Sequence, residues 1–569
     1  VGSEMCIRDR IKGLLFGLFA CAALAACTND DIVENNGKGE QEKVKANLTL
    51  VIGAATNSSR AAGDAENGDD INTGTVAESA VSDAVVVLSP QFEGGAEVVS
   101  VLNKSQLNQE TVAGATVYMP NIKVTTSGEY KVLVVLNPTS GIKTIANGAS
   151  IAKYNEIAEY VYNYDGTGIN ELIGTLEDPR FMMVNQREAS VNVQSNNSED
   201  PTTLEVAVER VAAKITFVPS SLTIGQTEYS NRYALQVNTA EKVIAETREG
   251  YYVASNGQAY HITGLNKATA SGKTIWIWNG TRAFEDTGKE YSDTDLLIYN
   301  EIEMPADNAF EYEYKTTDGE QTWYVQLDKY ALTNLSNATY AARHIANAEF
   351  TSTQTFGLLD NTFRYIMDPN TIAKNNNVSG DYFYNKAADV EKAKVDNVSG
   401  DTGENPFFAA LPTAAESNTL GTCLTYCLEN SIKIESQNPQ SVTGIVFRGQ
   451  ICNAEGIPMG TIYKKDNNFY TDKEQLYAVY GRDVTDYETY EEGKCYYYSK
   501  GIEHSSTDAY MKNVIMRNNI YVLTVKSFKE IGSATITIPD GTEDTDKNFY
   551  LKLTSTILSW QVRFNNIEF

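Results

Sequence analysis

Cys27 is the first residue of the chain whose type and surroundings indicate a defined chemistry. An apolar run, 14–26, ends in Leu-Ala-Ala immediately before Cys27 and follows three basic residues: Arg8, Arg10 and Lys12. A basic start, an apolar stretch too short to span a bilayer comfortably, and small residues before the cut are typical of an export signal. A cysteine at the cut position indicates a lipoprotein signal. We therefore expect residues 1–27 to be a lipoprotein signal peptide and Cys27 to become the acylated first residue.

The four residues at the start do not fit this signal. Val-Gly-Ser-Glu, at 1–4, precedes Met5 and places an acidic residue ahead of the basic region. We expect residues 1–4 not to be native and translation to start at or near Met5.

A second reactive position is the peptide bond after Arg60. The pattern of Asn47–Gly53 predicts a strand, and the run Asn57-Ser-Ser-Arg60-Ala61-Ala62 follows it. Runs of small and polar residues such as this one form exposed loops that proteases cut. The acylated cysteine and a site that could release the rest of the chain are thus separated by one predicted strand.

No motif of an enzyme is complete in this sequence. Lys267–Thr274 ends like a phosphate-binding loop, but Lys267 stands where that loop needs its first glycine. Asp544–Asn548 begins like a calcium loop, but Phe549 replaces the turn glycine and no glutamate closes the loop. The sequence contains no Gly-x-Ser-x-Gly and no His-Glu-x-x-His motif. We therefore expect no enzyme activity, no cofactor and no bound metal.

The cysteines and histidines beyond the signal are too few for a disulfide framework or a Cys/His zinc site. The histidines are His261, His344 and His504, and the cysteines are Cys423, Cys427, Cys452 and Cys495. Buried free thiols are the expected state of these cysteines. A disulfide between Cys423 and Cys427, which are close in sequence, stays an open alternative.

The charge of the chain disfavours two classes of partner. The net charge is −28, and residues 1–60 contain seven basic and seven acidic residues, so the acidic excess lies in 61–569. An acidic surface repels nucleic acid and anionic lipid. We expect no nucleic-acid partner, and contact with a membrane only through the lipid on Cys27.

Most of the elements that the sequence predicts are strands. Short alternating apolar patterns are separated by Gly, Asn and Asp, as in sandwiches or barrels. Examples are 84–88, 130–136, 206–211, 214–218 and 520–526. The 34 tyrosines fit half-exposed strand faces. Candidate helices are few, at 151–162 and 387–394. A chain of 569 residues is long enough for two or more packed domains.

Several segments resemble the fimbrilin family of Bacteroidales, the subunits of type V pili. In the N-terminal part these segments are Glu129–Pro138, Arg180–Gln186 and Val208–Ile215. In the C-terminal part they are Thr425–Asn430, Thr443–Arg448, Lys494–Tyr498 and Arg517–Lys526. The C-terminal set is most similar to the major shaft subunit of the minor fimbria. The resemblance spans most of the chain after Cys27, although residues 225–420 contain few matching segments.

The resemblance implies a mostly β fold with two β-sandwich (transthyretin-like) domains in tandem and few short helices. Residues 28–60 would be a tether and a removable first strand. An N-terminal domain would follow at 61–220. The C-terminal domain, 221–569, would end in a donor strand at 556–569.

The resemblance also implies a route of assembly. Such subunits reach the cell surface as outer-membrane lipoproteins carrying palmitate, and a trypsin-like, Arg-specific protease cuts them after an arginine. The first strand then leaves, and the C-terminal strand of another subunit fills the groove. Here the cut would fall between Arg60 and Ala61. The strand lost would be 46–54, which carries these residues on one face: Leu48, Leu50, Ile52 and Ala54.

The end of the sequence has the alternation that a donor strand needs. Apolar residues alternate with polar ones at Leu558, Trp560, Val562 and Phe564. Ile567 and Phe569 resume the pattern one residue out of phase, which predicts a bulge or kink. On the resemblance, these six residues form the donor strand. An ordinary terminal strand of the same domain is the alternative.

The expected function is that of a structural subunit of a cell-surface fimbria, acting in adhesion and biofilm formation. Its partners would be copies of itself, other fimbrial subunits, the protease and host or bacterial surface receptors, and its mature form would lie in extracellular fimbriae. The alternative is an anchored surface lipoprotein that binds glycans. In that case tryptophans would line a sugar platform instead of packing in the core; the candidates are Trp276, Trp278, Trp323 and Trp560.

Overall fold

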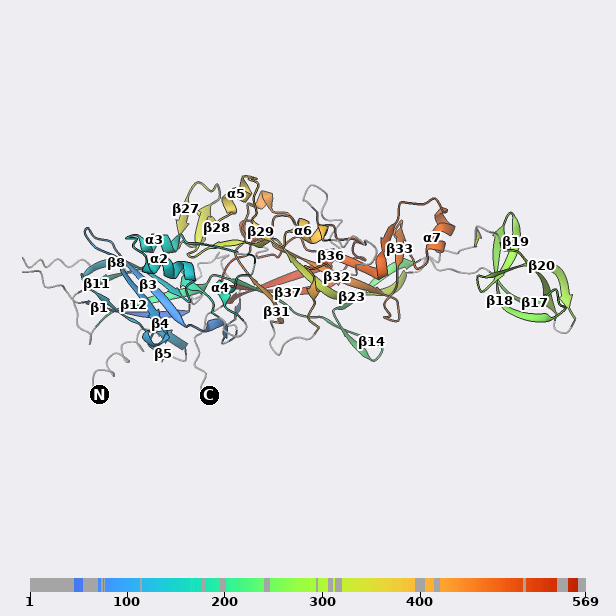
Figure 1. Ribbon diagram of the computed structural model, residues 1–569, viewed down its shortest axis with the longest axis horizontal. Coiled ribbons are helices and arrows are strands. Elements are labelled where there is room, and N and C mark those ends of the chain that lie inside the picture. The colour runs from blue at the N-terminus through green and yellow to red at the C-terminus, as the bar shows by residue number, and fades with distance from the viewer. Residues whose placement is uncertain are drawn as a thin grey trace, which may run out of the picture.

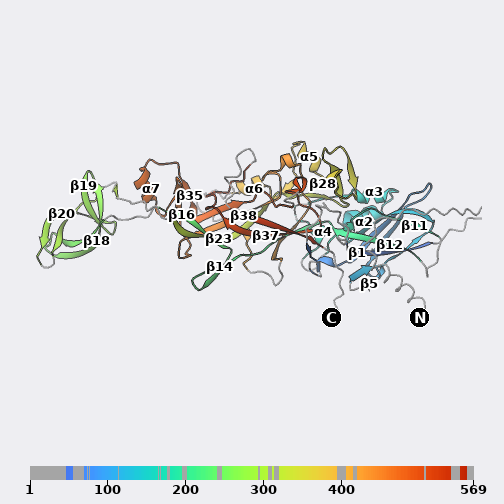
Figure 2. The same ribbon diagram turned by 180° about the vertical axis from the view of Figure 1, so that it is seen from behind.

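A computed structural model gives the fold of the chain. It describes residues 46–54, 70–72, 75, 77–112, 115–164, 166, 168–175, 180–194, 201–239, 246–292, 295–304, 311–312, 320–393, 405–413, 420–504, 508–539 and 551–560. The molecule is elongated, with its N-terminal sheet at one end, a small β module at the other and a long sandwich between them (Figures 1 and 2).

A ten-stranded sheet forms the N-terminal end. In order across the sheet its strands are β4 (Val98–Asn103), β3 (Asp83–Pro90), β8 (Gly128–Leu136), β10 (Met183–Asn185), β12 (Thr202–Arg210), β1 (Ala46–Ala54), β6 (Ala115–Tyr118) and β5 (Gln109–Val112). Two further strands join it, β11 (Ala189–Val193) beside β8 and β7 (Asn121–Val124) beside β1.

The two faces of this sheet are buried in different cores. Along β3, Ala84, Val86 and Leu88 pack in one core cluster, which also receives side chains from β1, β12 and β7. The alternate residues, Val85 and Val87, pack in a second cluster under two helices, α2 (Ser140–Asn147) and α3 (Lys153–Ala158). The period-two rule of strands therefore explains why this stretch is continuously apolar: both of its faces are covered.

Two sheets face each other in the central sandwich. The first contains β2 (Asp70–Asn72), β38 (Leu551–Trp560), β37 (Asn519–Phe528), β13 (Ala213–Phe217) and β31 (Thr422–Cys427). The second contains β35 (Glu488–Tyr490), β33 (Ile462–Lys465), β34 (Asn468–Tyr470), β16 (Arg232–Thr239), β23 (Glu320–Thr333), β32 (Gly444–Cys452) and β36 (Lys494–Tyr498), with β30 (Ala409–Ala410) beside β23. Their inner faces share one core, in which Phe217 and Leu523 pack with Phe447.

A small module is inserted between β16 and β23. Its strands are β17 (Thr247–Val253), β21 (Leu296–Ile302), β20 (Arg282–Tyr291), β19 (Lys273–Trp278), β18 (Ala259–Ala270) and β22 (Glu311–Tyr312). Because β17 pairs with both β18 and β21, five of these strands close into a ring. The ring has its own core, which includes Trp276, Phe284 and Tyr299. We call residues 247–312 the inserted barrel.

Short elements complete the described part of the chain. The remaining strand pairs are β14 (Ser221–Ile224) with β15 (Thr227–Ser230), β24 (Leu335–Ser336) with β29 (Phe383–Tyr384), β25 (Ala338–Tyr340) with β9 (Val161–Asn163), and β26 (His344–Asn347) with β27 (Thr353–Thr355) and β28 (Phe363–Met367). The other helices are α4 (Asn170–Ile173), α5 (Thr371–Asn375), α6 (Ala387–Lys392) and α7 (Lys473–Tyr480). No helix in the described ranges is both long and apolar enough to span a membrane.

The predicted fold class, mostly β with tandem sandwiches and few short helices, is confirmed. The helix predicted at 387–394 is α6, whereas the one predicted at 151–162 is shorter, because 161–163 leave it to form β9. The division at residue 220 stays a prediction; β13, which precedes that position, pairs with the late strands β31 and β37.

Candidate strand-exchange site

The strand β1 is a fully embedded part of the N-terminal sheet. Leu48, Leu50 and Ile52 are each 0% exposed, and the alternate residues Thr49 and Val51 are half-buried. The apolar face predicted for this strand is therefore the face that packs in the core. Ala54 is the last residue of β1.

Both edges of β1 are paired. On one edge it runs parallel to β12, from Leu48 opposite Thr202 to Ala54 opposite Val208. On the other edge it is antiparallel to β7 and meets β6 at Tyr118. The Leu50 N–H also donates to the carbonyl of Pro120 at 3.2 Å. Removal of β1 would thus expose two strand edges at once.

The walls around β1 are apolar. Val206 and Val208 of β12, together with Ile122 and Val124 of β7, are each at most 3% exposed and belong to the same core cluster as Leu50. We call the space that β1 occupies between β12 and β7 the β1 slot. A strand that replaced β1 would have to supply both ladder hydrogen bonds and bulky apolar side chains on one face.

The other end of the proposed exchange lies on β38, in the central sandwich. This strand is antiparallel to β37 from Leu551, opposite Phe528, to Ser559, opposite Asn519. Leu558 and Trp560 also lie opposite Asp70 and Asn72 of β2, in parallel pairing. The structure therefore pairs these two predicted donor residues within their own chain.

The remaining predicted site residues lie outside the described part of the chain. They are Cys27, Arg60, Ala61, Val562, Phe564, Ile567 and Phe569. The acidic segment Asp544–Asn548 lies there as well.

A buried carboxylate that the sequence did not single out lies between the N-terminal sheet and the sandwich. Glu78, 2% exposed, accepts hydrogen bonds from Lys214 Nζ at 2.7 Å and from the Tyr426 hydroxyl at 2.6 Å. Its backbone carbonyl accepts from Arg210 Nε at 2.9 Å, and Arg210 Nη2 donates to Ser79 Oγ at 3.0 Å. We call Glu78 with these partners the Glu78 anchor.

The charges of the Glu78 anchor depend on each other. Burial alone would raise the pKa of Glu78, but the charge and hydrogen bond of Lys214 and the hydrogen bond of Tyr426 bring that pKa below its ordinary value. Burial lowers the pKa of Arg210, and the nearby Glu78 carboxylate opposes this shift. The residues of the Glu78 anchor lie far apart in sequence, so no local sequence motif predicts it.

A second buried ionic group joins the same parts of the molecule. Glu209, at the end of β12, accepts from Arg343 through both carboxylate oxygens, with Nε–Oε1 at 3.1 Å. Arg517, just before β37, donates from Nη2 to Glu429 Oε2 at 2.7 Å. Arg343, Arg517 and Glu429 are all 0% exposed, and Glu209 is 1% exposed. Such bidentate geometry fixes orientation as well as charge.

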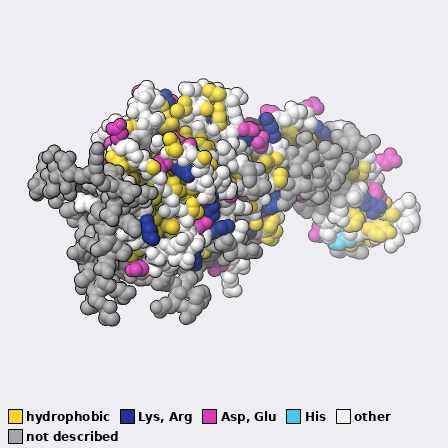
Figure 3. Space-filling model, turned by 60° about the vertical axis from the view of Figure 1, so that its left-hand side comes forward, with side chains coloured by type: hydrophobic (Ala, Val, Ile, Leu, Met, Phe, Trp, Pro, Cys, Tyr) yellow, Lys and Arg dark blue, Asp and Glu magenta, His cyan; other side chains and the backbone are white. Residues whose placement is uncertain are grey.

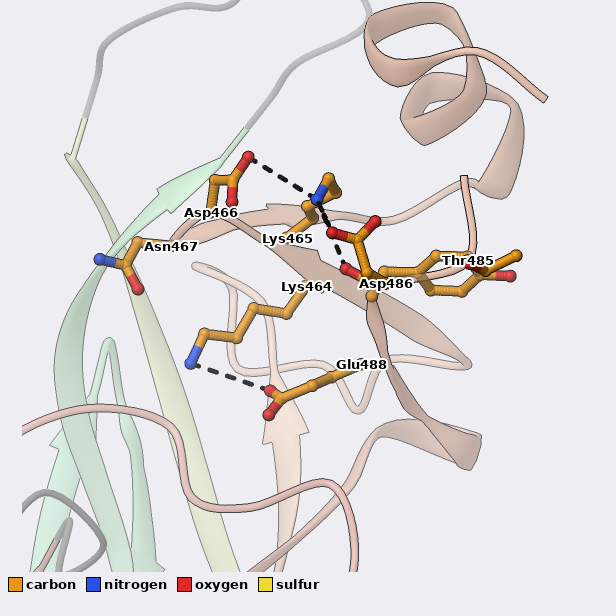
Figure 4. A pocket seen from close by; sticks show the side chains of 8 residues that line it. Lys464, Lys465, Asp466, Asn467, Thr485, Asp486 and Glu488 are labelled. Carbon is orange, nitrogen blue, oxygen red and sulfur yellow. Dashed lines mark hydrogen bonds and ion pairs between the residues drawn. The ribbon is translucent and has the colours of Figure 1, made fainter. Parts of the chain in front are cut away.

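One hollow of about 410 Å³ opens beside β33 and β34 (Figure 4). Its two lysines already face carboxylates. Lys465 Nζ lies 2.8 Å from Asp486 Oδ2, and Lys464 Nζ lies 3.9 Å from Glu488 Oε2. The hydrogen bond to Asp486 raises the pKa of Lys465. This arrangement of paired charges contains no nucleophile held against a base, so we assign it no chemistry.

The cysteines form no disulfide within the described residues, and two of the tryptophans are buried. The cysteines are Cys423, Cys427, Cys452 and Cys495, and all but Cys423 are buried. Trp276 and Trp323 are each 2% exposed and pack in cores, so neither lines an exposed sugar platform. Within the described ranges, no three His, Cys, Asp or Glu side chains are placed to hold a metal ion.

The inserted barrel carries exposed aromatic side chains of another kind. Tyr251 stacks on Tyr291 with ring centroids 4.5 Å apart, and Tyr260 is 46% exposed. Figure 3 shows hydrophobic side chains gathered beside a histidine on this module. Since the barrel and the N-terminal sheet lie at opposite ends of the molecule, these residues are not part of the β1 slot (Figures 1 and 2).

Comparisons with known proteins bear on the C-terminal region. Residues 488–566 match the family model "Major fimbrial subunit protein type IV, Fimbrillin, C-terminal". They begin with β35 and include β36, β37 and β38. No curated protein matches the chain.

Among solved structures, a fimbrilin from Porphyromonas gingivalis W83 is 13% identical, with 91% of this chain and 98% of that chain covered and a TM-score of 0.37. A putative cell adhesion protein from Parabacteroides distasonis ATCC 8503 is 12% identical, with coverages of 91% and 99% and a TM-score of 0.35. The tip fimbrial protein Mfa3 from Porphyromonas gingivalis is 10% identical, with coverages of 91% and 100% and a TM-score of 0.33. At these TM-scores the solved structures carry no argument about the chain. The family model shows that the C-terminal region, residues 488–566, is similar to the C-terminal part of fimbrilins.

Proposed function

We propose that the chain is a structural subunit of a cell-surface fimbria, of the shaft type, that polymerises by donor-strand exchange. The observation that carries the proposal is the position of β1. It is a nine-residue strand paired on both edges, it carries three fully buried apolar side chains, and Arg60 follows it closely in sequence. The fimbrilin match of 488–566 supports the same function.

In this proposal the precursor is exported, acylated at Cys27 and delivered to the outer membrane. An Arg-specific, trypsin-like protease cuts between Arg60 and Ala61, which separates β1 from the rest of the chain. The mature subunit then leaves its lipid behind and enters extracellular fimbriae, where it acts in adhesion and biofilm formation.

In this proposal, the cut converts a subunit whose slot is filled by its own β1 into one that binds a strand from another subunit. Each fully buried side chain of the size of Leu48, Leu50 or Ile52 contributes roughly 1.5–3 kcal/mol when it is removed from water. Loss of β1 gives up this contribution and leaves N–H and C=O groups of β12 and β7 without ladder partners. A strand from another subunit restores both the buried apolar side chains and the ladder hydrogen bonds. Head-to-tail insertion does not close on itself, so repeated insertion builds a filament.

The donor in the proposal is the C-terminal segment 556–569 of a neighbouring subunit. Since β37 and β2 hold residues up to Trp560 in the free chain, donation requires either release of that pairing or use of the residues beyond it. The apolar residues available beyond Trp560 are Val562, Phe564, Ile567 and Phe569.

The proposal is tested with purified protein comprising residues 28–569 and an Arg-specific protease. We expect wild-type protein to lose 28–60 and then to form filaments, as measured by intact mass and light scattering. The matched variant Arg60→Lys keeps the charge but removes the recognised residue, so it should stay uncut and monomeric. Filaments from uncut Arg60→Lys protein, or stable monomers after clean loss of 28–60, would reject the proposal.

A further inference from the structure

The short strand β2 connects the two ends of the proposed exchange. It pairs in parallel with the last three residues of β38, Leu558–Trp560, on the edge that β37 does not use. In sequence, β2 lies between the proposed cut at Arg60 and the Glu78 anchor. The first described strand after the proposed cut therefore pairs with Leu558–Trp560, the root of the donor segment.

The two sides of β2 are held in different ways before the cut. On the C-terminal side, the Glu78 anchor fixes the chain through Lys214, Arg210 and Tyr426, all of which belong to β12, β13 and β31. On the N-terminal side, residues 55–69 connect β2 to β1, which is locked in the N-terminal sheet by pairing on both edges.

A three-residue strand on its own pairs weakly, because few ladder hydrogen bonds offset the backbone entropy that it loses. Fixing both ends of the segment lowers that entropy cost, since the ends no longer have to be brought to the sheet. After the cut, only the Glu78 side remains fixed. Residues 70–72 then lose more conformational entropy when they pair with β38, and the pairing becomes weaker.

We propose that β2 is a clasp that keeps the root of the C-terminal strand paired in the precursor, and that the cut after Arg60 loosens it. One cut thereby has two effects on the subunit: β1 can leave its slot, and Leu558–Trp560 lose a strand partner. This inference rests on the proposed function for its cleavage site. The same cut would then regulate the C-terminal donor segment as well as the β1 slot that accepts it.

The clasp predicts which changes matter. The segment 70–72 should control the tail, because β38 is its ladder partner and no other described strand pairs with it. Loss of the Glu78 anchor should also free β2, since the anchor is its second fixed end. The upstream part of β38, Leu551–Ser555, is paired with β37 and should not respond.

The test is amide hydrogen exchange on the monomeric 28–569 protein, in wild-type form and in three variants. Ile71→Pro and Asn72→Pro each remove one backbone N–H, and neighbouring amides of a strand point to opposite sides. One of the two must therefore remove a donor facing β38. Ile71→Val keeps the backbone and is the matched control.

We expect at least one proline variant to speed exchange at 558–560 by tenfold or more, with exchange at 551–555 and in the Ile71→Val protein unchanged. Cleavage of the wild-type protein should speed exchange at the same residues. After cleavage, the proline variant that frees the tail should form filaments with a shorter lag than wild type. Equal exchange at 558–560 in all four uncut proteins, or no change on cleavage, would overturn the clasp.

Failure of the clasp and failure of the proposed function give different results. Exchange is read on monomers before assembly, and a designed protease site at 57–60 makes the cut independent of any native enzyme. If wild-type protein is cut but never assembles, the proposed function is rejected while exchange at 558–560 still decides the clasp. If filaments form with the same lag in wild-type and proline variants, the proposed function stands and the clasp does not control assembly.

Discussion

Glu78 is a buried carboxylate whose partners come from both the N-terminal sheet and the sandwich. Its carboxylate meets Lys214 and Tyr426 in a buried position, while Arg210 binds its carbonyl. Removal of one partner from a buried ionic group leaves an uncompensated charge, which costs more than the pair itself contributes. Among single residues, Glu78 is therefore a position where one substitution should strongly lower the stability of the folded protein.

Glu78→Gln should destabilise the protein by about 3–5 kcal/mol at neutral pH, because Lys214 loses its counter-charge while the side-chain volume is kept. Urea unfolding measures the loss. Glu492→Gln, at an exposed carboxylate, is the matched control and should be near neutral. A Glu78→Gln protein as stable as wild type would show that the carboxylate is not required.

The stabilising effect of Glu78 should also depend on pH. Its pKa is lowered on folding from an ordinary value of 4.5, so the folded state binds this proton more weakly than the unfolded chain does. The contribution is therefore present above that ordinary value and is lost as the pH falls through the lowered pKa. The difference in unfolding free energy between wild type and Glu78→Gln should shrink in acid. A difference that stays constant down to pH 3 would contradict this assignment.

The pair Glu209–Arg343 offers a second test at this scale. Arg343→Leu should cost about 3–5 kcal/mol, since it leaves the Glu209 carboxylate buried without its bidentate partner. The double variant Glu209→Leu with Arg343→Leu should cost less than the single change, because no unpaired charge remains. Thermal and urea unfolding of both variants give the comparison, and a strictly additive double variant would contradict it.

At the scale of elements, β1 and its slot behave differently before and after the cut. Leu50→Ala should destabilise the N-terminal sheet of the precursor by about 2–5 kcal/mol, because the side chain is fully buried. Thr49→Ala, on the opposite face, is the control and should cost less than about 1 kcal/mol. Once β1 has been removed, the assembled filament should be equally stable in both variants and in wild type. A filament weakened by Leu50→Ala would mean that β1 remains in its slot.

Alternation along the sequence was sufficient to predict this element. The pattern of Asn47–Gly53 predicts a strand, and the structure has β1 at Ala46–Ala54 with Leu48, Leu50 and Ile52 buried. The parallel partner β12 was not predictable, because pairing across such a separation is decided by packing and not by local pattern. The Glu78 anchor was not predictable for the same reason, because no local sequence pattern connects Glu78 with Lys214 or Tyr426.

At the scale of the whole molecule, the inserted barrel is separable from the parts that would polymerise. Asn238 of β16 pairs with Glu320 of β23, so the host hairpin is closed directly beneath the insertion. The barrel was not predicted, because residues 225–420 offered few segments that resemble the family. Its closure depends on the pairing of β17 with β18 and β21, which no single strand pattern reveals.

Replacement of residues 240–319 by Asn-Gly should leave the body folded, because the paired residues Asn238 and Glu320 are then joined by a three-residue hairpin loop, Thr239-Asn-Gly. The melting temperature of the body should change by no more than a few degrees, and cleavage and filament formation should persist. Calorimetry and light scattering measure the two outcomes. Loss of assembly in a folded deletion protein would show that the barrel belongs to the polymerisation machinery.

In the proposed filament, a strand from a neighbouring subunit replaces β1. A cryo-EM structure of filaments assembled from cleaved protein, at a resolution that identifies side chains in the slot between β12 and β7, would show this strand. We expect it to carry residues of the C-terminal segment 556–569 from the adjacent subunit. Density for the subunit's own residues 46–54, or an empty slot, would contradict this expectation.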